Sequence, residues 1–352
     1  MEYGAYRTIV AQSVFLGLLV IVVKGGGETH FIPVFLVYLG AHLCGFVYAV
    51  YVVLRKFVKP SKRIDVKLCK YLFVEAYPIA LRRFIRRVNF RIDTILLNFL
   101  KGNIYAGLFH GAYKISQGLM FVGEALVVSV FPVLSRHYVR ARESMDRLYD
   151  RSFRFLAISG GFLGVVLFTF SRELIRIILG KKYLQADYVV KIFAAMIVFM
   201  FLSKLAERML IVGKRQLLVT GIAAVALFAN VVFDLAFIPR WGTVGGAVAT
   251  LLSEIILFAL GLYYTYKHVS EVPGHVHILK VVLVFTVTCI LVNLCVNYFG
   301  RPASYVCGPG VYIGAVMAMG LTPKDDLKEL MMKLFTMVGV GPGAASNKDT
   351  IP

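Results

Sequence analysis

Long apolar runs, separated by short polar stretches, recur along almost the whole chain. A helix that rises about 1.5 Å per residue needs roughly 20 residues to cross the apolar core of a bilayer. About ten segments reach that length and predict transmembrane helices. They run approximately over Thr8–Lys24, Phe31–Leu54, Cys69–Leu100, Ala106–Leu134, Phe153–Leu179, Tyr188–Val212, Gln216–Ile238, Thr243–Tyr266, Ile278–Phe299 and Tyr305–Leu321. The expected fold class is all-α, a polytopic membrane helix bundle.

The loops between these segments are short and fall into two alternating sets. One set is much richer in Lys and Arg and contains RKFVKPSKRIDVK, RHYVRARESMDRLYDR, GKRQ, YKHVSEVPGHVHILK and TPKDDLKELMMK. The other contains GGGETH, KGNIY, GKKYLQAD, PRWGT and GRPAS. The positive-inside rule places the basic loops and both termini in the cytoplasm, which predicts a multi-pass protein of the plasma (inner) membrane. Residues 135–152 are predicted to form an amphipathic helix on the inner surface, or else a solvated basic loop.

The composition is that of a membrane protein and argues against other classes of protein. The chain is 59% hydrophobic and only 16% charged, where a soluble domain would have about 25% charged residues. The net charge of +20 resides mainly in the short loops, so no nucleic-acid partner is expected. The five cysteines and seven histidines show no metal-ligand spacing, and neither a metal nor another cofactor is expected. No catalytic or nucleotide-binding motif points to an enzyme.

Five arginines lie inside the third apolar segment, in the run YPIALRRFIRRVNFRIDTILL: Arg82, Arg83, Arg86, Arg87 and Arg91. One arginine at the centre of a spanning helix costs about 2.5–3.5 kcal/mol on insertion scales. On one continuous helix these side chains and Asp93 would form a polar stripe over roughly half the circumference. They could reach an interface, pair with acids such as Glu75 and Asp93, or line a cavity and bind an anionic substrate. The local acids are too few to pair with all five, which favours the cavity.

Further ionisable residues are predicted inside the membrane: Lys114, Glu124, Lys204, Glu207, Arg208, Asp234 and Glu254. Lys204 and Arg208 share a helix face, where they could line the cavity or extend toward the cytoplasmic interface. Glu124 is flanked by apolar residues. A buried carboxylate of this kind either pairs with a cation or carries a coupling proton, and pairing is the favoured interpretation.

Several ordered motifs carry a family resemblance over roughly 200 residues. The stretch from Glu75 to Arg136 contains Pro78, Arg91-Ile92-Asp93, Leu96-Leu97, Gly102, Gly107, Ala112-Tyr113-Lys114 and Phe131-Pro132-Val133-Leu134-Ser135-Arg136. Two later stretches are RELIRIILGKKYLQAD, with Gly180 and Tyr183, and ANVVFDLAFIPRWGTVGGAVATLLSE, with Asn230, Ile238-Pro239, Gly242, Gly246-Ala247 and Ser253-Glu254. Together they resemble polysaccharide flippases of the Wzx/RfbX type, in the multidrug/oligosaccharidyl-lipid/polysaccharide exporter superfamily.

The resemblance implies a domain organisation. Family members typically have fourteen helices, as two six-helix lobes around a central cavity plus two further helices, and the ten predicted here correspond to the fifth to the fourteenth. Residues 1–67 would hold the last two helices of an incomplete first lobe and a cytoplasmic linker. Residues 68–268 would form the second lobe, 269–335 two additional helices, and 336–352 a disordered tail. A truncated gene, a late start and a fragment would each explain the missing first helices.

The resemblance also implies a function: flipping of a polyprenyl-diphosphate-linked oligosaccharide by alternating access, for cell-surface polysaccharide such as the O-antigen of lipopolysaccharide. The five arginines, Lys114, Lys204 and Arg208 would contact the diphosphate. Asp93, Glu124, Glu75, Asp234 and Glu254 would couple or form ion pairs. Other polysaccharide-assembly proteins could be partners, besides membrane lipids. Alternatives are a membrane-embedded polymerase or ligase, which should carry a large external loop, a drug/cation antiporter, which should have an acidic cavity, and a non-functional remnant.

Overall fold

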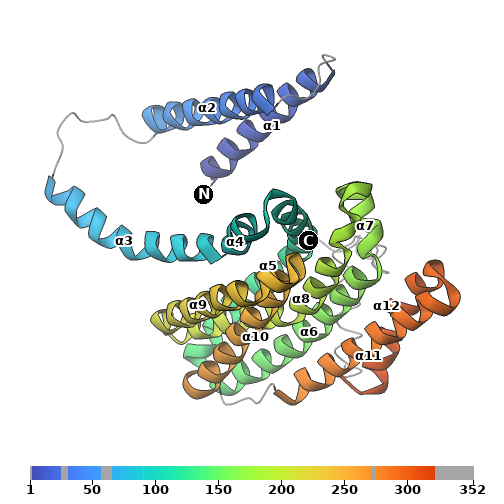
Figure 1. Cartoon of the computed structure of the whole chain (residues 1–352). Coiled ribbons are helices and arrows are strands. Elements are labelled where there is room, and N and C mark those ends of the chain that lie inside the picture. Colours follow the sequence, from blue (N-terminus) through green and yellow to red (C-terminus); the bar gives the residue numbers. More distant parts are fainter. Residues whose placement is uncertain (1, 25–30, 57–65, 90, 271–274, 322–352) are drawn as a thin grey trace, which may run out of the picture. The chain divides into compact units, whose positions relative to one another are not determined.

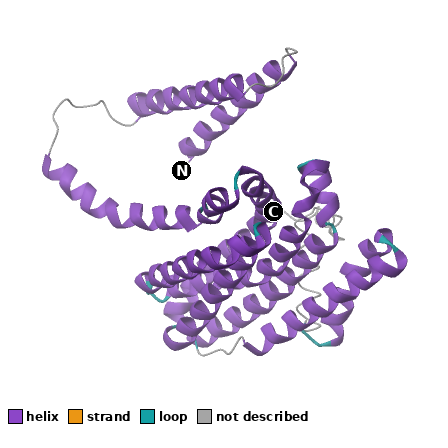
Figure 2. Cartoon of the chain, in the orientation of Figure 1, coloured by secondary structure: helices purple, strands orange, loops and turns teal. Residues whose placement is uncertain are grey.

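The computed structural model describes the backbone of residues 2–24, 31–56, 66–89, 91–270 and 275–321. Over these residues the chain forms helices joined by turns and short loops, without a strand (Figure 2). The predicted tail of residues 336–352 and the whole basic segment TPKDDLKELMMK lie outside this range. The all-α fold class predicted from the apolar runs is confirmed.

The described elements are labelled in chain order in Figure 1. They are α1 (Glu2–Lys24), α2 (Phe31–Lys56), α3 (Val66–Asn89), α4 (Ile92–Lys101), α5 (Asn103–Arg140), α6 (Arg142–Thr169), α7 (Ser171–Ile178), the 3₁₀ helix η1 (Lys181–Ala186), α8 (Asp187–Val212), α9 (Gln216–Trp241), α10 (Thr243–His268), α11 (His275–Phe299) and α12 (Arg301–Ala318).

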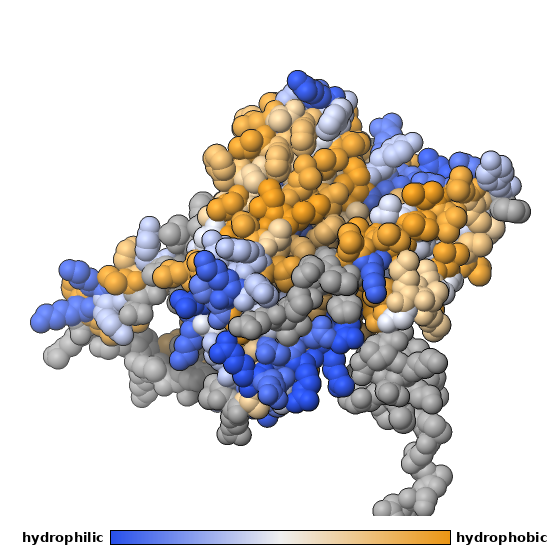
Figure 3. Space-filling view, turned by 90° about the horizontal axis from the view of Figure 1, so that it is seen from below, coloured by the Kyte–Doolittle hydropathy of each residue, from blue (hydrophilic) through white to orange (hydrophobic). Residues whose placement is uncertain are grey.

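Seven helical segments of the described chain are long and apolar enough to cross a membrane. They lie in α2, α5, α6, η1 with α8, α9, α10 and α11, and the apolar helix Ile9–Val20 of α1 is shorter. Many large apolar side chains on these helices are exposed, such as Phe46, Phe121 and Phe228. Figure 3 shows one face of the molecule, where hydrophobic residues form broad continuous areas. Exposed apolar surface of this extent is expected of helices that face lipid.

Two predicted spans are wrong as single helices. The segment Cys69–Leu100 is divided between α3 and α4, with Arg91 in a non-helical conformation before α4. The segment Phe153–Leu179 is divided at Phe170 into α6 and the short α7. Neither break contains a glycine or a proline, the residues that most often mark an interruption. Their positions therefore could not be located from breaker residues in the sequence.

The separate amphipathic helix predicted over residues 135–152 is also wrong. These residues belong to the end of α5 and the start of α6, which meet at the extended residue Ala141 (φ −158°, ψ 88°). The basic loop is thus only a sharp connection between two long helices.

The chain divides into two compact units, residues 1–78 and 79–352. In the first unit α1 and α2 pack against each other as a helical hairpin. The rings of Phe15 and Tyr38 meet edge to face, with centroids 5.8 Å apart. This contact joins the two helices through apolar side chains.

The second unit is organised around α8. This helix packs against α5, α6 and α10, while α9 packs on α10 and both α11 and α12 pack on α6. α8 buries apolar residues on all sides, including Phe193, Ile197, Phe201 and Met209. A helix that is apolar all round lies in the interior of a bundle. α8 is therefore the central element of this unit.

Glycines let α5 and α6 approach α8 closely. A Cβ at Gly123 of α5 would lie 2.5 Å from the ring of Phe201, and one at Gly160 of α6 would lie 3.3 Å from the same ring. At Gly164 a Cβ would lie 2.6 Å from the carbonyl oxygen of Ala194. These positions exclude larger side chains and allow the close helix contacts typical of membrane bundles.

Candidate functional site

The arginine run of the sequence lies on the last part of α3 and ends just before α4. The backbone is helical through Asn89. The side chains of Arg82, Arg83, Arg86, Arg87 and Glu75 lie outside the described residues, so their direction stays a prediction. Arg91 is described: it precedes the first residue of α4 and is exposed. Because the chain leaves the helical path there, the predicted stripe is not continuous through Arg91 and Asp93.

The described basic side chains near this point form a group, which we call the basic group: Arg91, His110 and Lys114. His110 and Lys114 lie one turn apart on α5, and both are exposed. The positive charges of Lys114 and Arg91 both act on the His110 ring, which brings the three together electrostatically. Among the described residues neither Arg91 nor Lys114 has an ion-pair partner. Exposed cations in this state are available to an anionic ligand.

Close to the basic group along the chain, α4 and α9 bury two carboxyl groups, the buried acid pair Asp93 and Asp234. Asp93 is 4% exposed and Asp234 0%. The two carboxyl groups are close enough to act on each other electrostatically. Two negative charges held together in a buried site repel each other, so the pair favours binding of a proton or a cation. α4 packs directly on α9 and α10 to bring them together.

Two neutral side chains complete the surroundings of this pair. Asn230 Nδ2, one turn before Asp234 on α9, donates to Asp93 Oδ1 at 2.9 Å. The hydroxyl of Thr250 on α10 lies 3.4 Å from the same oxygen and 2.8 Å from the carbonyl oxygen of Gly246. Three buried oxygens, Asn230 Oδ1 and both carboxyl oxygens of Asp234, receive no hydrogen bond from a described residue. A cluster of unmatched acceptors suits a proton or a small hard cation.

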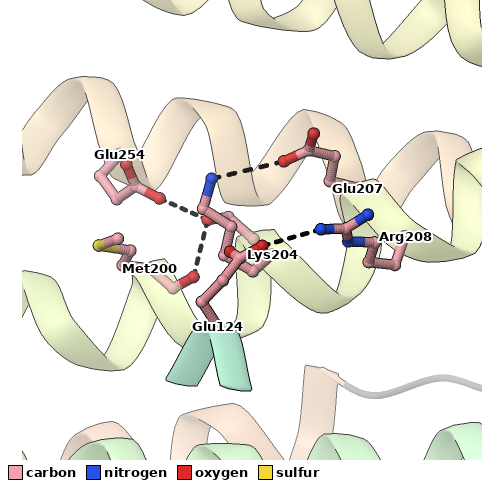
Figure 4. A network of polar contacts seen from close by, with 7 residues as sticks. Glu124, Met200, Lys204, Glu207, Arg208 and Glu254 are labelled. Atoms are coloured by element: carbon pink, nitrogen blue, oxygen red, sulfur yellow. Dashed lines mark hydrogen bonds and ion pairs between the residues drawn. The ribbon is translucent and has the colours of Figure 1, made fainter. Parts of the chain in front are cut away.

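A second polar cluster, the ion-pair network, consists of Glu124, Lys204, Glu207 and Arg208 (Figure 4). Arg208 Nη2 of α8 donates to Glu124 Oε1 of α5 at 2.8 Å. Lys204 Nζ lies 3.5 Å from Glu207 Oε2, three residues away on α8. The interpretation of Glu124 as a paired carboxylate is confirmed, and Lys204 and Arg208 each have an acidic neighbour.

Glu254 lies beside this network but is held by a hydroxyl group. Ser203 donates a hydrogen bond to Glu254 Oε1 from α8 to α10, and its oxygen also lies 3.1 Å from the carbonyl oxygen of Met200 (Figure 4). Glu254 therefore extends the network from α8 onto α10.

A cavity of about 120 Å³ joins the two clusters. Its polar lining includes Asp93, Asn230, Thr250, Glu254, Lys204, Glu207 and Tyr113, beside smaller polar and apolar side chains. Tyr113 of α5 thus lines the same cavity as residues of both clusters. The cavity thus continues from the buried acid pair to the network inside the second unit.

Of the residues predicted from the sequence, the structure places Asp93 beside Asp234. It also places Glu124, Lys204 and Arg208 in one region with Glu254. Lys114 and Arg91 join a basic group that includes His110, which was not anticipated. Asn230, Thr250 and Tyr113 were also missed as site residues. A local signal existed for two of these, since Asn230 and Asp234 are spaced i, i+4 and His110 and Lys114 have the same spacing.

Comparison with known proteins finds similarity to polysaccharide and glycan biosynthesis proteins, at low sequence identity. The family model for "Polysaccharide biosynthesis protein" matches residues 1–138. The capsular polysaccharide biosynthesis protein CapF of Staphylococcus aureus is 24% identical over 202 residues, 57% of this chain and 50% of the relative. The probable low-salt glycan biosynthesis flippase Agl15 of Haloferax volcanii is 22% identical over 182 residues, 51% of this chain and 38% of that protein.

The fold is similar to that of the lipid II flippase MurJ in its inward closed conformation. The TM-score is 0.68 at 15% sequence identity, and the match covers 88% of this chain and 66% of the solved one. At that identity the likeness establishes the fold. An uncharacterized membrane protein of Methanocaldococcus jannaschii is 20% identical over 94% of this chain and 67% of its own length.

These matches confirm the predicted resemblance to polysaccharide flippases and their exporter superfamily. The chain shares the helical fold of that solved membrane protein. It spans 50% and 38% of the length of the two named curated relatives.

Proposed function

We propose that this chain contributes the second lobe of a flippase that moves a polyprenyl-diphosphate-linked oligosaccharide across the membrane by alternating access. The observation that carries the proposal is the exposed basic group, Arg91, His110 and Lys114, placed next to a buried acid pair in an exporter fold. Cations without acidic partners suit a diphosphate, whose oxygens accept several charge-assisted hydrogen bonds. The arginines of α3 would extend this anion-binding surface.

In this proposal the buried acid pair is the coupling site. Asp93 and Asp234 share a low-dielectric environment in which no described residue gives them a basic hydrogen-bond partner, so the pair favours binding of a proton or small cation. Discontinuous helices that place polar side chains near the cavity are a common feature of secondary transporters. The α3–α4 break, which directs Asp93 toward α9, has this character.

The domain plan and orientation extend the proposal. Residues 68–268 act as the second lobe, residues 269–335 as two additional helices, and both termini face the cytoplasm of the plasma (inner) membrane. Cell-surface polysaccharide, such as O-antigen, is the expected product of the pathway. Accessibility of single introduced cysteines to an impermeant reagent, in the loops after α4 and after α8, tests the orientation directly.

The central experiment measures binding of polyprenyl diphosphate to the purified full chain in detergent, beside polyprenyl monophosphate and neutral polyprenol. Diphosphate should bind most tightly, and Lys114→Glu should weaken it by about tenfold or more, since one charge-assisted contact is replaced by repulsion. Lys114→Arg should retain binding. Flipping of a fluorescent lipid-linked oligosaccharide in proteoliposomes should follow the same order.

Lys101→Glu is the matched control, because Lys101 is an exposed lysine at the end of α4 outside the basic group. It should bind the diphosphate as the unmodified chain does. Equal binding of neutral polyprenol and diphosphate, or an equal loss in Lys101→Glu and Lys114→Glu, would contradict the proposed anion site.

A further inference from the structure

The hairpin of α11 and α12 holds two thiols in contact, a feature outside the proposed transport site. Cys295 lies near the end of α11 and Cys307 in the first half of α12. Both thiols line one small apolar groove, together with Leu291, Leu294, Tyr298 and Val311. α11 and α12, which carry them, pack along each other. The shared groove and this helix packing place the two side chains near each other, close enough to interact.

The hairpin is fixed well enough to keep the thiols together. α11 and α12 pack along each other and against α6. The hydroxyl of Tyr312 donates to the carbonyl oxygen of Ile158 at 3.0 Å. A Cβ at Gly308 would lie 2.6 Å from Thr169 Oγ1 and 3.0 Å from Val292. Because Gly308 directly follows Cys307, this close packing sets the position of the thiol on α12.

The thiols are also accessible near one end of the hairpin. Cys307 is exposed and Cys295 is partly exposed. Cys295 precedes the end of α11 at Phe299 by about 6 Å of helix, at about 1.5 Å per residue. Such a depth lies in the interfacial zone of a bilayer, where aqueous reagents still reach side chains.

We propose that Cys295 and Cys307 form a disulfide by exchange with a small disulfide such as oxidised glutathione. The exposed Cys307 thiolate attacks one sulfur of the oxidant, whose S–S bond breaks and releases one thiolate that takes up a proton. The Cys295 thiolate then attacks Cys307 Sγ, which forms the protein disulfide and releases the second small thiol. Two protein thiols are oxidised and one small disulfide is reduced to two thiols.

The cross-link would join α11 to α12 close to their connection. In the cell its formation rests on the proposed orientation, which places this connection on the outer, more oxidising side. The pairing itself depends only on the local geometry of α11 and α12. The two parts can therefore be tested separately.

The test treats the purified full chain with oxidised glutathione, alkylates free thiols and maps peptides without reduction. The Cys295–Cys307 cross-linked peptide should form at least about tenfold more than any peptide containing Cys289, which lies on α11 away from the groove, since only close thiols satisfy disulfide geometry. Cys307→Ser should leave Cys295 free, whereas Cys289→Ser should leave the cross-link unchanged. Separate glutathione adducts on Cys295 and Cys307 without a cross-link would overturn the proposal.

A second experiment alkylates the free thiols in intact cells before the membranes are solubilised. A cross-link already present there supports the pair and the outward orientation. Fully reduced thiols in cells, with efficient cross-linking of the purified chain, would support the pair and overturn the orientation. Neither result depends on the flipping assay, so failure of the transport proposal stays distinguishable.

Discussion

The buried acid pair and the ion-pair network border the same cavity but hold their charges by opposite means. In the network, Glu124 is neutralised by Arg208, and Glu207 lies beside Lys204. In the acid pair, two carboxyls face each other, with only an amide and a hydroxyl group as further described hydrogen-bond donors. A paired charge is satisfied by the protein itself, while an acid pair is satisfied only when it binds a proton or cation. This difference favours a structural role for the network and, under the proposed function, binding and release of a proton or cation for the acid pair.

The largest effect should come from removing the acid pair's capacity to bind and release a proton or cation. Asp93→Asn and Asp234→Asn each keep the side-chain size and remove a titrating group. Transport should fall by about 5- to 150-fold, the range of a typical coupling free energy of about 1–3 kcal/mol. Thermal stability in detergent should stay the same or rise, because two carboxyls no longer face each other. Flipping rates and unfolding temperatures check this.

Asp150→Asn is the control, since Asp150 forms an ion pair with Arg154 within α6 and lies outside the cavity. It should transport normally. Loss of folding rather than of transport in Asp93→Asn would show that the acid pair is structural, and the contrast with the network would disappear.

A smaller effect, on stability, should follow from breaking the network. Arg208→Ala leaves Glu124 without its cation, and since the two side chains are 29% and 38% exposed, we expect a loss of about 1 kcal/mol in unfolding free energy. Glu124→Ala should cost a similar amount. A double-mutant cycle in a denaturant titration would give the coupling of the two residues.

Substrate flipping by these network variants should remain within a few-fold of the unmodified chain. If Arg208→Ala instead abolished transport at unchanged stability, Arg208 would belong to the substrate site, as the sequence had suggested.

The smallest effect should come from Thr250→Val. The Thr250 hydroxyl has one hydrogen, and its 2.8 Å contact to the Gly246 carbonyl is shorter than the 3.4 Å contact to Asp93. Removing it should cost about 0.5–1 kcal/mol, the value of one ordinary hydrogen bond, with a small change in transport. Thr286→Val, which removes a comparable contact to a carbonyl oxygen on α11, is the matched control for stability. A transport loss as large as that of Asp93→Asn would assign Thr250 to the ligand shell.

The sequence predicted the helices well because long apolar runs between basic loops have few alternative structures. It could not predict the α3–α4 break, since neither a glycine nor a proline marks that point of the chain. The Asn230–Asp93 contact joins residues 137 positions apart, and the Arg208–Glu124 pair residues 84 apart. A single sequence does not indicate which residues so far apart along the chain come into contact. Individual intramembrane charges were identified, but which of them meet depended on tertiary packing.

The position of Phe201 has a consequence for how this unit can move. Its ring fills the space left by Gly123 on α5 and approaches Gly160 on α6. One side chain of α8 therefore fixes the relative positions of three helices along their axes. A slide of α5 along α8 by a single residue would push Val122 or Glu124 into the ring in place of Gly123. Packed interiors of this kind resist shear. The three helices are therefore expected to turn together as one block, and displacement is expected at the block's borders, where α4 and α9 carry the acid pair.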